Sequence, residues 1–163
     1  MRITGCAQDP YGRPCHVHSQ PTTRGDSLEN DHLARKATGG GALVLIIEDY
    51  QDCCDLYGTY LALLGFRVLT ASEGLEGIRL ATETHPDVIL MDLNLPGIDG
   101  YEVTRRLKDA AATRDIPVVA LTAQNLPRAE WLRRAGFESG IAKPVLPERV
   151  GDIVTRVVQQ RTV

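Results

Sequence analysis

The 163-residue sequence lacks a long apolar run, an export signal and a cysteine framework, and each absence excludes a class of protein. The longest apolar run is Ala42 to Ile47, which is too short to cross a bilayer. The N-terminal residues contain no apolar core of a secretory signal, so we expect a cytoplasmic protein. The four cysteines, at 6, 15, 53 and 54, show no disulfide pattern, which agrees with a reducing compartment.

The sequence also lacks an excess of positive charge. Its 18 lysines and arginines are outweighed by 21 aspartates and glutamates, which gives a formal net charge of −3. Nucleic-acid-binding domains are usually basic, so this balance disfavours direct contact with nucleic acid. A composition that is 43% hydrophobic and 24% charged is typical of a globular protein, and the length allows one domain with some chain to spare.

The composition changes near residue 40. Residues 1–40 contain three prolines, many glycines, serines and threonines, and almost no periodic apolar residues. Such a segment cannot bury enough apolar surface to offset its ordering entropy, so we predict a disordered tail at 1–40 and a folded domain at 41–163. The tail holds two cysteines and two histidines, but Cys6 and Cys15 lack the close spacing of a zinc site, and we interpret them as incidental.

From residue 42 onward, short apolar runs alternate with segments of helical periodicity. The expected strands are 42–47, 66–69, 87–91, 116–121 and 139–142. Three of these runs are continuously apolar, as in parallel strands that are buried on both faces. The alternation predicts an α/β fold, a doubly wound parallel sheet of five strands with five helices.

The segments between the strands carry apolar residues at helical spacing. A first helix is predicted at 51–64, with one face formed by Leu56, Tyr57, Tyr60, Leu61 and Leu64. Ser72 is predicted to cap the second helix, and Pro127 to lie in the first turn of the fourth. Asp99 and Glu102 are spaced like a capping box for the third helix. The last helix has the clearest periodicity, carried by Val150, Ile153, Val154, Val157 and Val158.

Polar residues follow four of the five expected strands. They are Glu48 and Asp49, Asp92, Thr122, and Lys143. Each residue alone has an ordinary explanation, such as capping the next helix. Because ligands of such sheets bind at the carboxyl ends of parallel strands, the set together predicts a single site at that edge.

The charges of this set indicate its chemistry. At a separation of about 5 Å and an effective dielectric constant of about 20, two carboxylates repel by roughly 3 kcal/mol, so three pairs cost roughly 10 kcal/mol. A divalent cation and Lys143 together balance the three negative charges. Oxygen ligands without histidine or cysteine suit Mg²⁺ or Mn²⁺. Such a cluster prepares a carboxylate to accept a phosphoryl group, with Lys143 and Thr122 binding the developing charge.

Four stretches of the sequence resemble the response regulator receiver domain of two-component signalling. They are LVLIIEDYQD (43–52), PDVILMDLNLPGIDGYE (86–102), IPVVALTA (116–123) and AGFESGIAKPV (135–145). The resemblance covers residues 42–160. It implies the flavodoxin-like receiver fold, with strand order 2-1-3-4-5.

The resemblance implies a role for each acidic residue of the set. Asp92 is expected to accept the phosphoryl group. Asp49 and Glu48 are expected to hold Mg²⁺ together with Asp92 and the main-chain carbonyl of Asn94.

The resemblance also assigns the remaining positions, with one departure. Lys143 is expected to contact the phosphoryl oxygens, and Thr122 to move toward them and transmit the switch. The Lys143–Pro144 bond is expected to be cis. Receiver domains usually carry Tyr, Phe or His three residues before the lysine, where this sequence has Gly140, so the usual coupled switch lacks its ring.

The implied function is phospho-acceptor signalling. A histidine kinase or a histidine phosphotransfer protein is expected to phosphorylate Asp92, and the domain is expected to catalyse only its own phosphorylation and dephosphorylation. The expected target is a protein that contacts the last strand and the last two helices, a face that contains Trp131. The 123-residue domain and 40-residue tail leave no chain for an output domain, so we expect a single-domain regulator without nucleic-acid or membrane contacts.

Two alternatives remain from the sequence. The first is a Mg²⁺-dependent phosphohydrolase with Asp92 as nucleophile, a class that usually has a second aspartate where this chain has Asn94. The second is a receiver-like interaction module that no longer responds, which Gly140 favours and the intact acceptor, metal and lysine positions disfavour.

Overall fold

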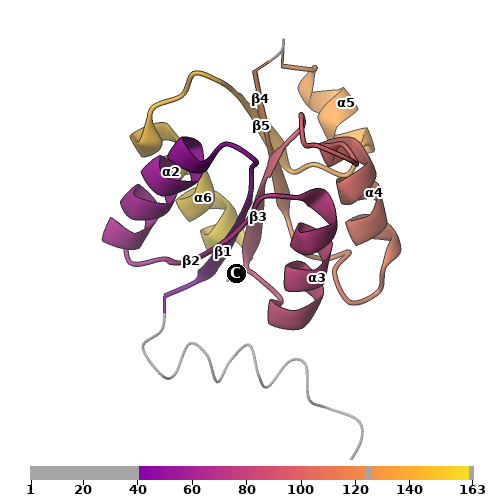
Figure 1. The fold of residues 1–163 in the computed structure, drawn as a ribbon, viewed down its shortest axis with the longest axis horizontal. Helices are drawn as coiled ribbons and strands as arrows, with labels where there is room; N and C mark the ends of the chain where they lie inside the picture. The colour runs from indigo at the N-terminus through magenta and orange to yellow at the C-terminus, as the bar shows by residue number, and fades with distance from the viewer. Residues whose placement is uncertain (1–40, 124–125, 162–163) are drawn as a thin grey trace, which may run out of the picture. The chain divides into compact units, whose positions relative to one another are not determined.

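The computed structural model describes residues 41–123 and 126–161, so the predicted tail at 1–40 lies outside the described residues. Strands and helices alternate along the chain (Figure 1). They are β1 (Leu43–Ile47), α2 (Gln51–Leu63), β2 (Arg67–Ala71), α3 (Gly74–Thr84), β3 (Val88–Asp92), α4 (Gly100–Asp109), β4 (Val118–Thr122), α5 (Ala129–Arg134), β5 (Ser139–Ala142) and α6 (Pro147–Gln160). In this part of the chain, no helix is long and apolar enough to span a membrane.

The five strands form one parallel sheet in the order β2-β1-β3-β4-β5, which confirms the predicted topology. Strand β1 therefore lies between β2 and β3, and the strand order reverses at β1. Val44 pairs with Val88 and Ile47 with Met91. Glu48 follows Ile47 and Asp92 follows Met91, so this register places Glu48 and Asp92 beside each other at the carboxyl edge of the sheet.

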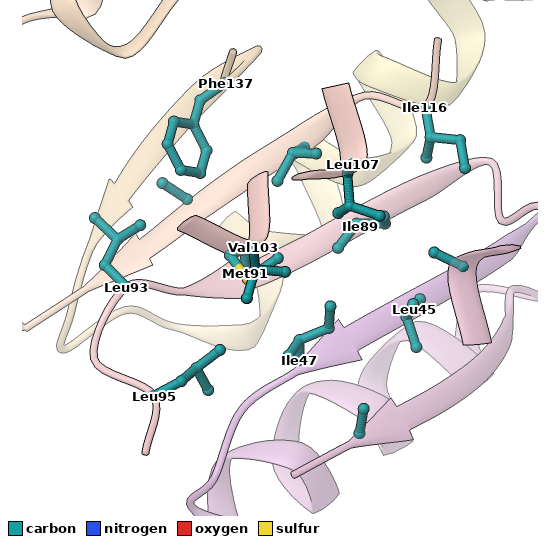
Figure 2. Close-up of a cluster of buried hydrophobic side chains, with 14 of the residues drawn as sticks. Leu45, Ile47, Ile89, Met91, Leu93, Leu95, Val103, Leu107, Ile116 and Phe137 are labelled. Carbon is teal, nitrogen blue, oxygen red and sulfur yellow. The ribbon is translucent and has the colours of Figure 1, made fainter. Parts of the chain in front are cut away.

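Helices cover both faces of the sheet. Figure 1 shows α2 and α6 on one face and α3 and α4 on the other. Strands β1, β3 and β4 are buried at every residue, because alternate side chains enter the two apolar layers. Figure 2 shows one of these layers, in which Leu45, Ile89 and Met91 of the strands lie near Val103 and Leu107 of α4. The continuous apolar runs of the sequence follow from this double burial.

Two predicted helix starts are wrong. Helix α3 begins at Gly74, with Glu73 rather than Ser72 at the N-cap. The backbone N–H of Ser72 instead donates to the Glu76 carboxylate at 3.3 Å. A glutamate side chain of the first helical turn therefore bonds the chain just before the helix, and the serine hydroxyl does not cap it. Helix α5 begins at Ala129, and Pro127 therefore precedes the helix instead of lying in its first turn.

Other helix details are confirmed only in part. Leu56 and Leu64 are 51% and 48% exposed, although the spacing placed them on a buried face, because α2 turns only Cys54, Tyr57 and Leu61 fully inward. The Asp99 carboxylate accepts from the Glu102 N–H at 2.8 Å, as a capping box requires. The Glu102 side chain does not return the bond and pairs with arginines of its own helix.

The burial contrast within α2 yields a stability test. Leu61 is fully buried and Leu63 is 79% exposed on the same helix. Leu61→Ala is expected to lower the free energy of unfolding by about 2–5 kcal/mol, because it removes buried methyl groups and leaves a cavity. Leu63→Ala is expected to change the free energy of unfolding by less than about 0.5 kcal/mol. Chemical denaturation checks both values, and equal effects would contradict the assigned packing of α2.

Candidate functional site

The carboxyl ends of four strands bring the predicted site residues to one edge of the sheet. Glu48 follows β1, Asp92 ends β3, Thr122 ends β4, and Lys143 follows β5. In the register, Asp92 pairs with Leu121, the residue before Thr122, and Thr122 pairs with Ala142, the residue before Lys143. Thr122 is 2% exposed, so its hydroxyl belongs to the buried floor of this edge.

Three carboxyl groups meet at the ends of β1 and β3. Glu48, Asp49 and Asp92 each offer an oxygen, and these oxygens all lie within 4.8 Å of one another. Glu48 and Asp92 are buried, whereas Asp49 is exposed to solvent. The predicted acidic cluster therefore exists, and two of its three charges lie where water cannot screen them well.

Lys143 bridges the two buried carboxylates. Its Nζ donates to Asp92 Oδ2 at 2.8 Å and also to Glu48 Oε2. Burial lowers the pKa of Lys143, but the hydrogen bonds to the two carboxylates outweigh burial and raise this pKa above its usual value. The ammonium group thus stays charged and offsets part of the repulsion inside the cluster.

The two buried carboxyl groups titrate differently. Burial raises the pKa of Glu48 to about 7, even though Lys143 donates to it. Burial also acts to raise the pKa of Asp92, but the Asn94 N–H, which donates to Oδ1 at 2.9 Å, and Lys143 outweigh burial and lower this pKa below its usual value. Pairs of acids with separated pKa values mark different chemical roles. The lowered pKa favours the ionised form of Asp92.

The backbone of Glu48 is held from two sides. Its N–H donates to the Ala71 carbonyl at 3.0 Å, and its carbonyl accepts from the buried Cys54 thiol at 3.4 Å. Sequence reasoning assigned Cys54 no contact with the site. Its position six residues after Glu48, on the first turn of the following helix, was the signal for this contact. Cys54 therefore helps to orient the acidic end of β1.

Gly100 permits the close approach of α4 to Asp92. The Gly100 N–H donates to the Leu93 carbonyl at 3.1 Å. A Cβ atom at residue 100 would lie 2.3 Å from the Asp92 carbonyl oxygen and 2.9 Å from the Leu93 Cα, both of which are backbone atoms that cannot turn aside. Sequence reasoning did not assign Gly100 a role, although a glycine directly after the capping Asp99 was the available signal.

The position without the usual aromatic ring is filled by other side chains. Gly140 lies in β5 opposite Ala120. A Cβ atom at residue 140 would lie 2.7 Å from Leu126 Cδ1 and 2.8 Å from Leu132 Cδ1. The two leucines therefore occupy the space above Gly140 in place of a ring.

Two further expectations have different outcomes. The Lys143–Pro144 bond is cis, as the resemblance implied. The Asn94 main chain lies at the site through the N–H bond to Asp92, while the role of its carbonyl as a metal ligand stays a prediction.

Gly100→Ala is expected to lower the free energy of unfolding by about 1–3 kcal/mol, because its Cβ would overlap backbone atoms that cannot repack. Gly58→Ala in α2 is the matched control, since its Cβ would meet only Val68 Cγ1 at 3.7 Å. The control is expected to raise the free energy of unfolding by up to about 1 kcal/mol through helix propensity. Urea denaturation measures both changes, and a stabilising Gly100→Ala would contradict the contact with Asp92.

Comparison with known proteins agrees with this geometry. The model of the response regulator receiver domain family matches residues 44–155. The polar-differentiation response regulator DivK of Brucella ovis is 41% identical over 103 residues, which cover 63% of this chain and 84% of DivK.

Two solved structures are similar to this chain in fold and in sequence. The receiver domain of a sensor histidine kinase from Pseudomonas aeruginosa PAO1, whose crystal structure has a magnesium ion coordinated in the active site cleft, is 32% identical, with a TM-score of 0.66 over 73% of this chain and 98% of that domain. The chemotaxis response regulator CheY4 of Vibrio cholerae is 26% identical, with a TM-score of 0.67 over 72% of this chain and 98% of CheY4. The chain belongs to the response regulator receiver domain family.

Proposed function

We propose that this signalling protein accepts a phosphoryl group on Asp92 from a histidine kinase or a histidine phosphotransfer protein. The observation that carries the proposal is the Lys143 ammonium between Asp92 and Glu48, beside a third carboxylate within 4.8 Å. A cation next to an ionised, low-pKa carboxylate prepares that carboxylate for an electrophilic phosphorus atom.

In the proposed step, an Asp92 carboxylate oxygen attacks the phosphorus of a phosphohistidine. The new O–P bond forms as the N–P bond breaks, and the imidazole leaves with its electron pair and takes up a proton. As charge develops in this step, Lys143 shifts its hydrogen bonds from the carboxylates to the phosphoryl oxygens beside them, and the Thr122 hydroxyl donates to one of these oxygens. These preplaced donors stabilise the charge that spreads over the phosphoryl oxygens.

Mg²⁺ is the proposed cofactor, held by Glu48, Asp49, Asp92 and the Asn94 carbonyl. Magnesium ligands at about 2.1 Å from the ion lie up to about 4 Å apart, so carboxylate oxygens within 4.8 Å of one another need only a small closure. The magnesium ion in the Pseudomonas receiver domain supports this assignment. When bound, the ion neutralises charge on the transferring phosphoryl group.

The domain bounds, the target and the cellular location are also proposed. We propose a tail at 1–40 and a receiver domain at 41–163, which contains the family match at 44–155. The target is proposed to be a protein that contacts β5, α5 and α6, without nucleic-acid or membrane contacts. We propose a cytoplasmic location, which agrees with the free thiols of Cys53 and Cys54.

Incubation of the chain with Mg²⁺ and acetyl phosphate is expected to add the mass of one phosphoryl group, which intact mass spectrometry detects. Asp92→Asn is expected to abolish the gain, because it removes the nucleophilic oxygen. Lys143→Ala is expected to slow the gain by roughly 10²-fold or more, since one preplaced charge is lost.

Asp109→Asn is the matched control, because this aspartate is exposed on α4. It is expected to leave the mass gain unchanged. A gain that persists in Asp92→Asn would refute Asp92 as the acceptor. Steady turnover of small phosphomonoesters by the unaltered chain would instead support the phosphohydrolase alternative.

Mg²⁺ affinity is expected to rise with pH until the pH exceeds about 7, the pKa of Glu48. Below that pH the Glu48 carboxyl keeps its proton, and Mg²⁺ must displace the proton to bind. Isothermal titration calorimetry in buffers of different ionisation enthalpy counts the released proton. Glu48→Gln is expected to bind Mg²⁺ more weakly and to lose the pH dependence in this range. An unchanged pH dependence in Glu48→Gln would contradict the assignment.

A further inference from the structure

The charges of the domain are strongly divided along the chain. Residues 43–99 carry ten acidic and two basic side chains, a net charge of −8, whereas residues 100–161 carry seven acidic and eleven basic side chains, a net charge of +4. Positive charge is therefore concentrated in the second half of an otherwise acidic domain. The short helix α5 and the residue before it hold Arg128, Arg133 and Arg134 against a single Glu130.

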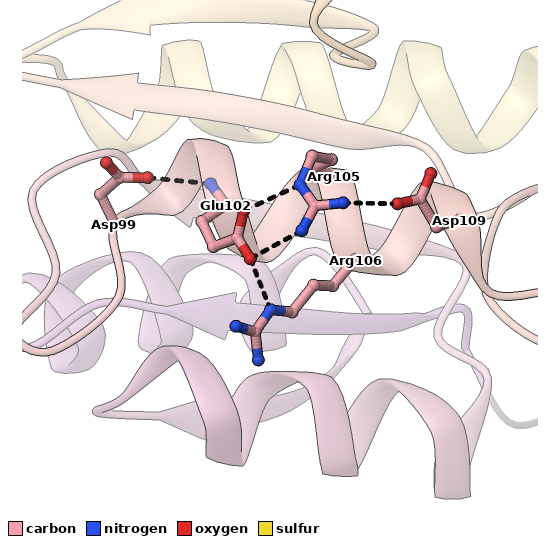
Figure 3. Close-up of polar contacts among 5 residues, drawn as sticks. All are labelled: Asp99, Glu102, Arg105, Arg106 and Asp109. Atoms are coloured by element: carbon pink, nitrogen blue, oxygen red, sulfur yellow. Dashed lines mark hydrogen bonds and ion pairs between the residues drawn. The ribbon is translucent and has the colours of Figure 1, made fainter.

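The arginines of α4 are neutralised by their own helix. Arg105 pairs with Glu102 and Asp109, and Arg106 pairs with Glu102 (Figure 3). Elsewhere Arg79 pairs with Glu83 at the (i, i+4) spacing. Ion pairs within a single helix therefore neutralise these exposed arginines of α3 and α4.

The arginines at α5 are not neutralised in this way. Among the described residues, none of Arg128, Arg133 and Arg134 has an ion-pair partner, although Glu130 stands at the (i, i+4) spacing from Arg134. All three arginines are exposed. Their guanidinium groups are open to carboxylates supplied by another molecule.

Exposed apolar side chains accompany these arginines. Trp131 is 48% exposed and packs edge-on against Tyr101 at a centroid distance of 5.2 Å. Leu126 is 41% exposed and rests over Gly140 beside Leu132. Leu132 is the only fully buried residue of α5. A supported tryptophan among arginines has the composition of a binding hot spot.

We propose that the α5 surface, defined as Leu126, Arg128, Trp131, Arg133 and Arg134, binds an acidic segment of the target protein that carries an apolar side chain among its carboxylates. The carboxylates pair with the arginines, and the apolar side chain covers Trp131 and Leu126. The inference rests on the proposed function, because α5 belongs to the face through which the domain is proposed to signal.

A protein segment fits this surface better than a nucleic acid does. The two exposed apolar side chains are stabilised by burial against another apolar group. A polyanion would also meet the strong negative charge of residues 43–99 elsewhere on the same small domain. A short acidic segment pairs with the arginines of the α5 surface without extending to the acidic side chains of residues 43–99.

The test selects displayed random peptides on the full chain, in the presence of Mg²⁺ and with or without beryllofluoride. The most enriched peptide is then synthesised with a fluorescent label, and its affinity is measured by fluorescence anisotropy. The variants are Arg128→Glu/Arg133→Glu/Arg134→Glu and, separately, Trp131→Ala. The matched control is Arg67→Glu, an exposed arginine of β2 at the opposite edge of the sheet. Circular dichroism confirms that each variant is folded.

Enrichment of acidic peptides with an apolar residue is expected, with affinity that falls as salt rises. The triple reversal and Trp131→Ala are each expected to weaken binding about tenfold or more, and Arg67→Glu less than about twofold. Enriched peptides that are not acidic, or equal binding by the triple reversal, would overturn the inference. Tighter binding of a single-stranded oligonucleotide, or self-association through α5 seen in sedimentation, would also overturn it.

The acetyl phosphate assay separates this inference from the proposed function. A mass gain at Asp92 without selection of acidic peptides would refute the α5 inference alone. Peptide binding that depends on the α5 arginines, together with no mass gain, would refute phosphorylation and leave the docking surface in place.

Discussion

The repulsion among three carboxyl groups at one sheet edge is the constraint on which the site depends. Glu48 and Asp92 are buried beside each other because β1 and β3 are adjacent parallel strands. Lys143, 95 residues along the chain from Glu48, supplies the cation that makes this burial tolerable. A buried cluster of acids with too few cations is poised to take up positive charge, and that property suits a metal ion.

The surrounding residues keep the Asp92 carboxylate in place through its two oxygens. The Asn94 N–H holds one oxygen of Asp92, and Lys143 holds the other. Gly100 lets the start of α4 rest directly on the Asp92 carbonyl. Asp92 is thus the last residue of a core strand, and the start of α4 packs directly on its backbone.

The proposed output side of the domain departs from the usual receiver pattern. Leu126 and Leu132 fill the space above Gly140 where a ring would otherwise lie. Helix α5 is short and inserts only Leu132 fully into the core, while its tryptophan and arginines face outward. A helix with so few buried residues is expected to have a low local stability.

The sequence by itself determined the alternation of strands and helices, the apolar faces and the identities of Glu48, Asp92, Thr122 and Lys143, because double burial and strand-end chemistry leave local patterns. It misplaced the starts of α3 and α5 and the burial of Leu56, since caps and solvent exposure depend on neighbouring elements. Only the tertiary structure decided that Glu48 and Asp92 have opposite pKa shifts, that Gly100 abuts Asp92, and that leucines cover Gly140. The pKa shifts arise from contacts between segments distant in sequence, and the space at each glycine depends on how neighbouring elements pack against it.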